Sequence, residues 1–207
     1  MTTEMETGIA VVVFGDRRVP RSLAALPAAR IVDPAGIDAA ADGVRRLVVV
    51  GGEADLAAVL SRLMRKELLD IEVAHVRAGG WIQLRARRAM AGAARRVPLI
   101  RDDTGTVLVG AALWVPPAGA ATIHGEAVVD DTVLFDGEVT GVRIEPTPQP
   151  PGLRATVLSG RRRRWVTGRA AQLGTGGAQV VRDGVAGVRE VKRSTFYRHT
   201  TGWLRVG

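Results

Sequence analysis

The sequence predicts an α/β N-terminal lobe, a Rossmann-like parallel sheet with helices, followed by a β-rich antiparallel, sandwich-like lobe. In residues 1–95, short apolar runs alternate with helix-forming segments, which is the pattern of a parallel sheet covered by helices. In residues 96–207, strand-like runs are separated by Gly, Pro and Asp, which is typical of antiparallel pairing. A length of 207 residues is enough for two small lobes that each bury a core.

The N-terminal lobe begins with a strand at Ile9–Phe14, an apolar run rich in valine that ends at Gly15. Such a continuous run indicates a strand buried on both faces. The elements expected after it are a short helix over Pro20–Leu26, a strand at Ala29–Val32, a short helix at Gly36–Gly43 and a third strand at Arg46–Val50.

The third strand runs directly into Gly51–Gly52, and a helix is expected after this turn. Glu53 and Asp55 stand in its first turn, where carboxylates suit the positive end of the helix dipole and cap free N–H groups. Apolar residues then recur at helical spacing, so that one face of the helix is buried; they are Leu56, Val59, Leu60, Leu63, Met64 and Leu68.

The last elements of the first lobe are expected to be a strand at Ile71–Val76, a Gly79–Gly80 turn and a basic helix from Trp81 to Ala91. A Pro-rich surface loop over Pro146–Gly152 lies within the second lobe. The strand-like runs of that lobe are TGTVLVGAALWVP, EAVVDDTVLFDGE, GVRIEP, LRATVL, WVTGRAAQL, AQVVRDGV, VREVKR and TGWLRV.

Composition argues against secretion and against insertion into a membrane. Cysteine is absent, which excludes a disulfide framework and a thiolate zinc site. The first residues, MTTEMETG, are acidic and polar, unlike the basic start of a signal peptide. The longest apolar runs are far shorter than the roughly 20 residues that cross a bilayer. We therefore expect a cytoplasmic protein, whose contact with a membrane would be peripheral.

Positive charge is concentrated in the last third of the chain. Residues 1–140 carry 16 basic against 18 acidic residues, a net charge of −2, while residues 141–207 carry 13 against 3, a net charge of +10. Such a surface attracts partners that bear phosphate: nucleotides, anionic lipid headgroups or nucleic acid. The alternative is an arginine-rich composition that only solvates this face.

The strand–Gly–Gly–helix junction at Gly51–Gly52 is a candidate anion site. Two glycines let the backbone turn sharply and come close to a ligand, while the new helix offers unpaired N–H groups. The alternative is that any tight turn between a strand and a helix favours glycine. Neither a Walker lysine nor a G-x-G-x-x-G pattern is present.

This order of elements, with a Gly-Gly turn after the third strand, resembles the catalytic domain of diacylglycerol and related lipid kinases, which share a superfamily with NAD kinases. The family's turn reads GGDGT; here the two glycines and the acidic Glu53 match, while Ala54 and Asp55 do not. The family's next turn, P-x-G-T-x-N, corresponds to Arg77–Trp81, which retains only glycine. The resemblance implies ATP and Mg²⁺ as cofactors, with the nucleotide along Gly51, Gly52 and Glu53 and with Gly79 and Gly80 nearby.

A group of carboxylates in the second lobe is the second candidate. The family often carries an Asp-Gly-Glu turn in its β-rich lobe, and Asp136-Gly137-Glu138 has that form, while Asp183-Gly184 is an alternative for the equivalent late turn. The resemblance implies that Asp136 and Glu138 hold Mg²⁺, or that one of them acts as the base. The alternative is that Asp130-Asp131 and Asp136-Gly137 form hairpin turns, where Asp is favoured for backbone reasons.

Basic residues next to aromatic ones form the third candidate. Arg161–Arg164 precede Trp165, and Lys192-Arg193 precede Phe196 and Tyr197. Arginine suits phosphate oxygens, and Trp or Tyr suits a membrane interface or a stacked base. The alternative is that Phe196 and Trp203 fill the core.

Two hypotheses start from the resemblance. The first is a lipid-kinase-like, ATP-dependent phosphotransferase of the diacylglycerol kinase type. The second is a catalytically impaired relative, a non-catalytic scaffold that binds a nucleotide, an anionic lipid or a protein partner. A third hypothesis is a basic nucleic-acid-binding module, although no motif that reads DNA or RNA is present. Edge strands of the β-rich lobe that pair between chains would give a homodimer.

Overall fold

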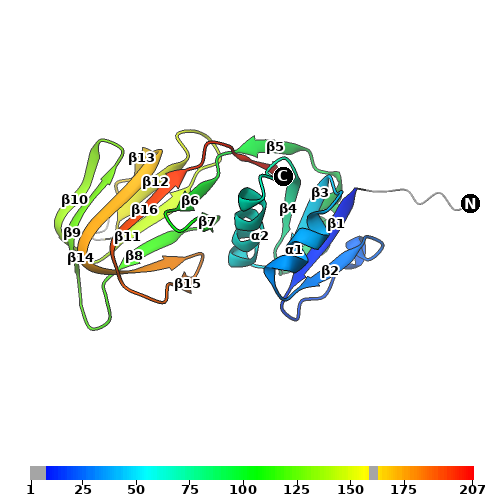
Figure 1. Cartoon of the computed structure of the whole chain (residues 1–207), viewed down its shortest axis with the longest axis horizontal. Coiled ribbons are helices and arrows are strands. Elements are labelled where there is room, and N and C mark those ends of the chain that lie inside the picture. Colours follow the sequence, from blue (N-terminus) through cyan, green and yellow to red (C-terminus); the bar gives the residue numbers. More distant parts are fainter. Residues whose placement is uncertain (1–7, 159–162) are drawn as a thin grey trace, which may run out of the picture. The chain divides into compact units, whose positions relative to one another are not determined.

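The computed structural model describes residues 8–158 and 163–207, and these form two compact units (Figure 1). The first unit contains the chain up to Val97 together with Gly202–Gly207, and the second contains Pro98–Thr201. Among the described residues, no helix is long and apolar enough to cross a membrane. Each unit has its own sheet and its own apolar core.

The first unit is built on a six-stranded sheet, sheet A, with the order β2-β1-β3-β4-β17-β5. The pairs from β2 to β17 are parallel, and β5 is antiparallel to β17 at one edge. This arrangement confirms the Rossmann-like parallel sheet. Its strands are β1 (Ile9–Phe14), β2 (Ala28–Ile31), β3 (Arg46–Val50), β4 (Glu72–Val76), β5 (Ala94–Val97) and β17 (Trp203–Val206).

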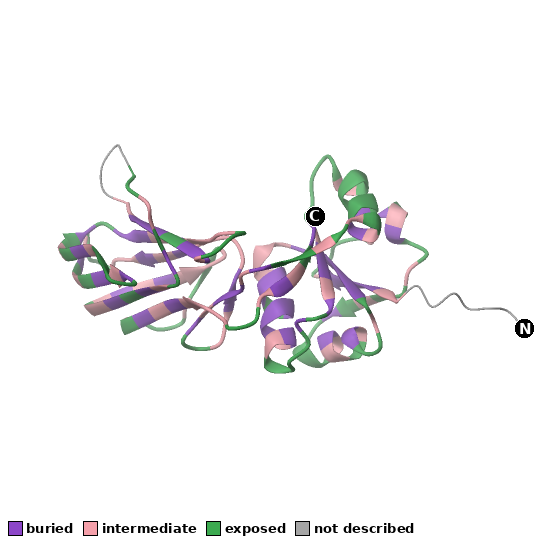
Figure 2. Cartoon of the chain, turned by 90° about the horizontal axis from the view of Figure 1, so that it is seen from above, coloured by how far each residue is buried: buried purple, intermediate pink, exposed green. Residues whose placement is uncertain are grey.

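Helices cover both faces of sheet A. On one face, Leu23 from the 3₁₀-helix η1 (Arg21–Leu23) and Ala86 and Ala89 from α3 (Ile82–Ala91) pack on alternate residues of the central strands. Helices α1 (Pro34–Ala41) and α2 (Glu53–Arg65) contact each other and cover the opposite face. Figure 2 shows the resulting contrast between buried strands and exposed outer helix faces.

Most elements of the first unit agree with the sequence expectations, and two differences have clear causes. The strands at Ile9–Phe14 and Arg46–Val50 are confirmed to the residue. The helix expected over Pro20–Leu26 is one 3₁₀ turn, because prolines at positions 20 and 27 leave little room for i→i−4 hydrogen bonds. Leu68 lies beyond α2 and is 40% exposed, because Glu67 adopts a left-handed conformation with a φ of 59° that ends the helix.

The second unit is antiparallel, as expected for the β-rich lobe. The main path of its sheet runs β13-β12-β11-β8-β14-β16-β6-β7, and the β9–β10 hairpin joins it through β14. The strands are β6 (Ile100–Asp102), β7 (Val107–Leu108), β8 (Ala112–Val115), β9 (Ile123–Val129), β10 (Thr132–Val139), β11 (Val142–Pro146), β12 (Leu153–Val157), β13 (Val166–Gly168), β14 (Ala170–Arg182), β15 (Val185–Ala186) and β16 (Val191–Arg198).

The core of the second unit gathers around two aromatic side chains. Trp114 and Phe196 are fully buried, with their ring centroids 6.1 Å apart. The indole Nε1 of Trp114 donates a hydrogen bond of 3.0 Å to the Ser194 hydroxyl, so the buried polar atom is satisfied. The expectation that Phe196 fills the core is therefore confirmed.

The last strand departs from the division expected at residue 96, which assigned all of residues 96–207 to the β-rich lobe. Strand β17 lies in sheet A, parallel to β4 and antiparallel to β5. The physical reason is that Trp203 and Val206 are each only 9% exposed there, and both edges of β17 find backbone partners. Trp203 thus fills the core of the first unit.

Candidate functional site at the carboxyl edge of the parallel sheet

The edge at which the parallel strands of sheet A end carries the candidate site. The chain passes from β1 to β2 on one side and then to β3 and β4 on the other, so its direction across the sheet reverses between β1 and β3. In open α/β sheets, ligands bind outside the carboxyl ends of the strands at such a reversal. The loop that begins at Gly15 and the Gly51–Gly52 turn flank this point.

The Gly51–Gly52 turn is held by backbone and side-chain hydrogen bonds. The N–H of Gly51 donates to the carbonyl of Val76, 3.3 Å away, which ties the turn to the end of β4. The N–H of Gly52 donates to the Asp55 carboxylate at 2.7 Å. A Cβ on Gly51 would stand 2.7 Å from the Cβ of Asp55, so the close approach of Asp55 requires glycine at position 51. Asp55 therefore caps the turn at the start of α2, as its place in the first turn predicts.

Two arginines from neighbouring loops reach the first turn of α2. Arg17, in the loop after β1, has its Nη1 atom 3.4 Å from Oδ2 of Asp55 and also donates to the carbonyl of Phe14. Arg77, directly after β4, has its Nη1 atom 3.1 Å from Oε1 of Glu53. Each carboxylate in the first turn of α2 therefore has an arginine as its partner. The two positive charges balance the two negative ones.

His75 supports the turn from within the sheet. Its Nε2 atom lies 3.0 Å from the carbonyl oxygen of Gly51. Because that oxygen can only accept, the Nε2–H of the ring donates a hydrogen bond to it. Burial lowers the pKa of the His75 imidazole below its ordinary value, and the hydrogen bond to Gly51 only partly offsets this effect. A neutral imidazole with its proton on Nε2 is the form that fits this contact.

The loop between β4 and α3 brings Gly79 and Gly80 to the same edge. Gly79 has a φ of 130°, a conformation that favours glycine. The guanidinium of Arg85 donates to the carbonyls of Arg77 and Ala78, at 3.2 and 3.4 Å, and so fixes the start of this loop. Because Arg77 also contacts Glu53, the loop stands beside the Gly51–Gly52 turn.

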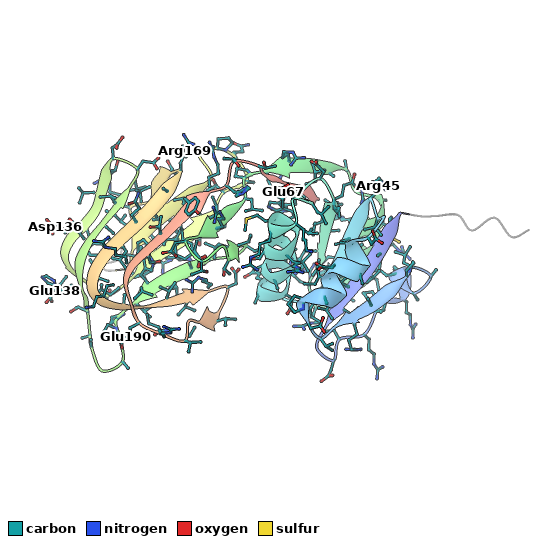
Figure 3. All side chains as sticks on the ribbon, viewed as in Figure 1. Arg45, Glu67, Asp136, Glu138, Arg169 and Glu190 are labelled. Atoms are coloured by element: carbon teal, nitrogen blue, oxygen red, sulfur yellow. The ribbon has the colours of Figure 1, made fainter. Side chains whose placement is uncertain are left out.

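Asp136 and Glu138 belong to the second unit, within β10 (Figure 3). Both side chains are exposed, and the register sets Asp136 opposite Glu126 and Glu138 opposite His124 on β9. Opposed residues of a strand pair lie on the same face, so the four side chains gather on one face of the hairpin. The Thr122 hydroxyl donates to Glu138 at 3.3 Å.

The hairpin turn expectation holds for one of the two acidic pairs. Asp130 and Asp131 form the turn between β9 and β10, and Asp130 has a φ of 48°. Asp136-Gly137, in contrast, lies in the middle of β10, because the strand continues through both residues to Val139. Among residues 8–158 and 163–207, no group of three or more His, Cys, Asp or Glu side chains could hold a metal ion.

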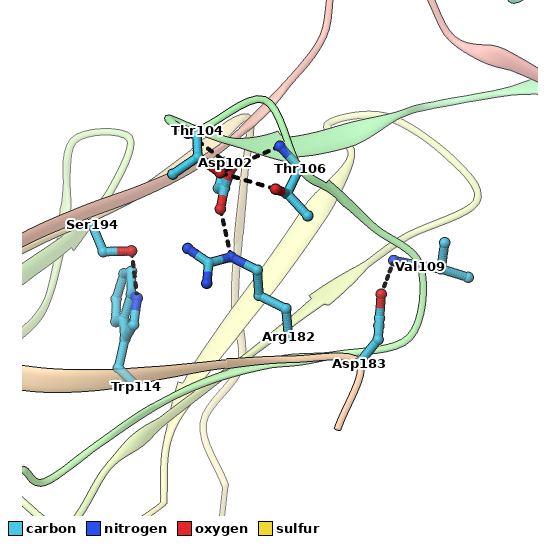
Figure 4. Close-up of polar contacts among 8 residues, drawn as sticks. All are labelled: Asp102, Thr104, Thr106, Val109, Trp114, Arg182, Asp183 and Ser194. Atoms are coloured by element: carbon cyan, nitrogen blue, oxygen red, sulfur yellow. Dashed lines mark hydrogen bonds and ion pairs between the residues drawn. The ribbon is translucent and has the colours of Figure 1, made fainter. Parts of the chain in front are cut away.

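Asp183 has a structural role at the turn between β14 and β15 (Figure 4). Its carboxylate accepts hydrogen bonds from three consecutive backbone N–H groups, those of Val109 at 3.1 Å, Gly110 at 2.6 Å and Ala111 at 3.1 Å. These bonds satisfy a loop that would otherwise leave donors without partners. The carboxylate is therefore committed to holding the loop before β8.

Asp102 is another carboxylate with a structural role, which was not predicted from the sequence. It is fully buried, pairs with the guanidinium of Arg182 and accepts hydrogen bonds from the N–H groups of Thr104 at 2.9 Å and Thr106 at 2.8 Å (Figure 4). The sequence signal for such a contact is an Asp two residues before a Thr in a short loop, here in the run Asp102-Asp103-Thr104-Gly105-Thr106.

The basic residues of the last third have varied surroundings. Glu145 bonds both Arg143 and Arg154, and the guanidinium of Arg154 also lies 4.3 Å from the centre of the Trp165 ring. Burial acts to raise the pKa of Glu145, but the hydrogen bonds from the two arginines outweigh it and hold that pKa below its ordinary value. The side chains of Arg163, Arg164, Lys192 and Arg193 are exposed, while Arg161 and Arg162 lie outside the described residues.

The structure therefore assembles part of the site expected from the sequence. Gly51, Gly52 and Glu53 share one edge with the loop that holds Gly79 and Gly80. Sequence reasoning missed Arg17 as a site residue and quoted Arg77 only as part of a degenerate turn. The signal was present, because each arginine comes within three residues of the carboxyl end of a predicted parallel strand.

No protein-family model and no curated protein sequence matches the chain. Among solved structures, a proposed diacylglycerol kinase and a diacylglycerol kinase from Bacillus anthracis str. Sterne match with TM-scores of 0.76 and 0.75, at 11% and 12% identity, over 96% of both chains in each case. An NAD kinase from Archaeoglobus fulgidus in complex with ATP matches with a TM-score of 0.65 at 13% identity, over 96% of this chain and 93% of that one.

These comparisons establish the fold. The chain has the two-lobe fold of diacylglycerol kinase-like and NAD kinase proteins, and the resemblance inferred from the Gly-Gly turn is confirmed at that level. A yeast NADH kinase complexed with NADH also matches, with a TM-score of 0.59 at 10% identity, over 88% of this chain and 65% of that one. At such identities the likeness is one of architecture.

Proposed function

We propose that the chain is a catalytically impaired relative of the diacylglycerol kinase-like proteins, which binds a nucleotide at the carboxyl edge of sheet A without transferring its phosphate. The observation that carries the proposal is the reversal between β1 and β3, with the Gly51–Gly52 turn and Arg17 beside it. The fold adds support, because two structures that share it hold ATP and NADH. Retention of the fold with altered turns favours binding over turnover.

The turn offers groups that suit a phosphate, with one internal competitor. Gly52 supplies an N–H, and a Cβ added at Gly52 would stand 3.9 Å from Nη2 of Arg17, so the guanidinium lies close to the turn. The Asp55 carboxylate now accepts from Gly52 and pairs with Arg17. A phosphate oxygen would take the place of this carboxylate as the anion that both groups bind.

Magnesium would neutralise negative charge on the phosphates of a bound nucleotide. The resemblance to diacylglycerol kinases implies Asp136 and Glu138, in the second unit, as the ligands of this ion. Two properties of the second unit support impairment: both side chains are exposed on a continuous strand, and Asp183 is already engaged with three backbone N–H groups. We therefore propose that nucleotide binding depends little on Mg²⁺.

A second candidate function is an active ATP- and Mg²⁺-dependent lipid kinase. One observation favours it, namely that Asp136 and Glu138 share one face of strand β10. In that case Asp136 and Glu138 would hold the metal or one of them would accept the proton of the attacking hydroxyl. The two functions differ in whether phosphate reaches a lipid acceptor.

Calorimetric titration with ATP, ADP and NAD, each with and without Mg²⁺, tests nucleotide binding. We expect saturable binding to the intact chain, and its loss in Gly52→Glu, which adds a carboxylate at the turn. Gly176→Glu is a matched control, because position 176 is exposed, has open space for a Cβ and lies in the second unit. No binding at millimolar nucleotide, or equal loss in both variants, would overturn the proposal.

Transfer of labelled phosphate from ATP to diacylglycerol in mixed micelles separates the two candidate functions. An impaired relative gives no product above the level without protein. Product formation that disappears in Asp136→Asn and Glu138→Gln would replace the proposal by the active kinase.

A further inference from the structure

Trp81 differs from the other tryptophans of the chain in its exposure. The chain has four, and Trp114 and Trp203 are buried in the two cores, while Trp165 lies under the guanidinium of Arg154. Trp81, at the start of α3, is 70% exposed. Trp is enriched at protein interfaces and at membrane interfaces, where its ring is covered and its N–H stays in water, so Trp81 is a candidate anchor if its neighbours extend the apolar surface.

Helix α3 has two distinct faces. Its inward face carries Ala86 and Ala89, which are buried in the core of the first unit, with the half-buried Ile82 and Met90 packed on the same cluster. Trp81, Leu84 and Arg88 follow each other at spacings of three and four residues, so they share the outward face. Leu84 is 42% exposed. The helix therefore presents the apolar pair Trp81 and Leu84 to solvent, in addition to the apolar face that packs on the core.

The segment of the first unit that contains α3 is strongly basic in sequence. Residues 73–97 contain six arginines and neither Asp nor Glu. Arg87 and Arg88 are exposed, and neither forms an ion pair with any part of the chain that the structure describes. Their charge is thus available to an anionic partner, in contrast to that of Arg77, which pairs with Glu53.

We propose that the outward face of α3, formed by Trp81, Leu84, Arg87 and Arg88, docks on the surface of an anionic lipid bilayer. An interfacial helix places Trp and Leu at the boundary between headgroups and acyl chains, and its arginines contact anionic headgroups. The combination on α3 is of this kind. The proposal goes beyond nucleotide binding and places membrane contact in the first unit, apart from the basic last third of the chain.

The charges disfavour a second copy of the chain as the occupant. A two-fold contact between identical α3 faces would bring the arginines of both copies into one interface, and α3 has no Asp or Glu to pair with them. Nucleic acid fits less well than a bilayer, because one exposed aromatic side chain gives no stacking series and Leu84 gains little beside phosphates. Of these three occupants, a lipid surface is the one that uses the apolar pair and the unpaired cations together.

Co-sedimentation of the full chain with vesicles tests the proposal. The probe vesicles are phosphatidylcholine with about 30% phosphatidylserine, compared with pure phosphatidylcholine. We expect binding only to the anionic vesicles, weaker by about tenfold in Trp81→Ala because the apolar anchor is lost. Arg87→Ala/Arg88→Ala should bind about 25-fold more weakly, because each arginine near such a surface contributes about a factor of five.

The matched control is Arg163→Ala/Arg164→Ala, which removes the same charge from exposed residues of the last third. It should retain vesicle binding to within about threefold, since the proposal assigns the headgroup contact to Arg87 and Arg88 and none to Arg163 and Arg164. In the unaltered chain, brominated acyl chains should also quench a fluorescence component that Trp81→Ala lacks.

Three outcomes overturn the proposal: no binding to anionic vesicles, full binding by Trp81→Ala, or a loss in the control as large as in the α3 variants. Binding to RNA or DNA that depends on Trp81, without binding to vesicles, would assign the face to nucleic acid instead. Nucleotide titration is done without vesicles, so failure of either proposal leaves the other standing. Far-ultraviolet circular dichroism of each variant checks that α3 is folded.

Discussion

At the residue scale, Asp102 and Arg182 form a buried ion pair whose surroundings complete it. The carboxylate is fully buried, and backbone N–H groups and the Thr104 hydroxyl satisfy its remaining lone pairs. Arg182 also lies over the Phe196 ring, with its Cζ atom 5.9 Å from the ring centre. The pair thus links the loop after β6 to the end of the long strand β14 and to the aromatic core.

Replacing Asp102 should be strongly destabilising. Asp102→Ala leaves a partly buried guanidinium and several donors without partners, so we expect a loss of about 3 kcal/mol in the free energy of unfolding of the second unit. Asp103→Ala is the matched control, because Asp103 is exposed, and its effect should stay within about 0.5 kcal/mol. Urea unfolding followed by circular dichroism measures both. Equal effects of the two variants would contradict the structural role of Asp102.

His75 should make the stability of the first unit depend on pH. Burial lowers the pKa of its imidazole in the folded chain, while the unfolded chain has an ordinary value near 6.5. The unfolded state therefore binds more protons below about pH 6.5, and the free energy of unfolding should fall with decreasing pH, by at most about 1.4 kcal/mol per pH unit, until the folded-state pKa is reached.

His75→Gln removes this titration while keeping an amide that can donate to Gly51. Chemical unfolding of the variant should show a flatter pH dependence between about pH 7 and pH 5 than that of the unaltered chain. Measurement at about pH 8, where the imidazole is neutral in both states, gives the cost of the substitution itself. An unchanged slope would show that His75 does not titrate between the folded and unfolded states.

At the element scale, the start of α2 combines a helix cap with a competing anion. Asp55 accepts a hydrogen bond from the N–H of Gly52 and pairs with Arg17. Glu53, two residues earlier, pairs with Arg77 and takes no part in the cap. The two carboxylates have the same charge and differ in whether they accept from the turn. This difference separates the effect of charge from the effect of the cap.

Asp55→Ala should therefore act in opposite directions on stability and on binding. Loss of the cap should lower the free energy of unfolding by about 1 kcal/mol, and release of the Gly52 N–H and of Arg17 should raise the affinity for ATP. Glu53→Ala removes the same charge and should give a smaller gain. Thermal unfolding and calorimetric titration measure the two effects. If both variants gain affinity equally, net charge rather than the cap controls binding.

The sequence predicted elements well where one local pattern decided them. Ile9–Phe14 and Arg46–Val50 are mainly apolar, continuous strands. The helical spacing of apolar residues after Gly52 predicted which face of α2 is buried. Only part of the candidate site could be predicted. The glycines indicate a turn from local sequence alone, whereas the contact of Arg17 with Asp55 joins residues of separate loops and depends on the fold. Asp136-Gly137 does not form a turn, although local preference favours one, because β10 continues through both residues and pairs them with Glu126 and Gly125 of β9.

At the scale of the whole molecule, the chain leaves the first unit at Val97 and returns to it at Gly202. The strand-like run TGWLRV predicted a strand but could not tell which sheet it joins, because strand preference carries no information on the partner. Trp203 and Val206 bury in sheet A, and β17 forms hydrogen bonds to strands on both sides. The second unit is thus inserted between β5 and the strand that pairs with it.

Deletion of residues 203–207 should separate the two units in stability. It removes a strand between β4 and β5 and the side chains of Trp203 and Val206, a loss above about 5 kcal/mol, which is comparable to the whole stability of a domain of this size. The first unit should then unfold at low urea, while the second keeps its own transition, with Trp114 in its buried aromatic core as the reporter in near-ultraviolet circular dichroism. Deletion of Gly207 alone leaves β17 in place and should change neither transition. A shortened chain that unfolds with the midpoint of the intact one would show that sheet A does not need its sixth strand, and a complete loss of both signals would show that the inserted unit depends on the sheet that encloses it.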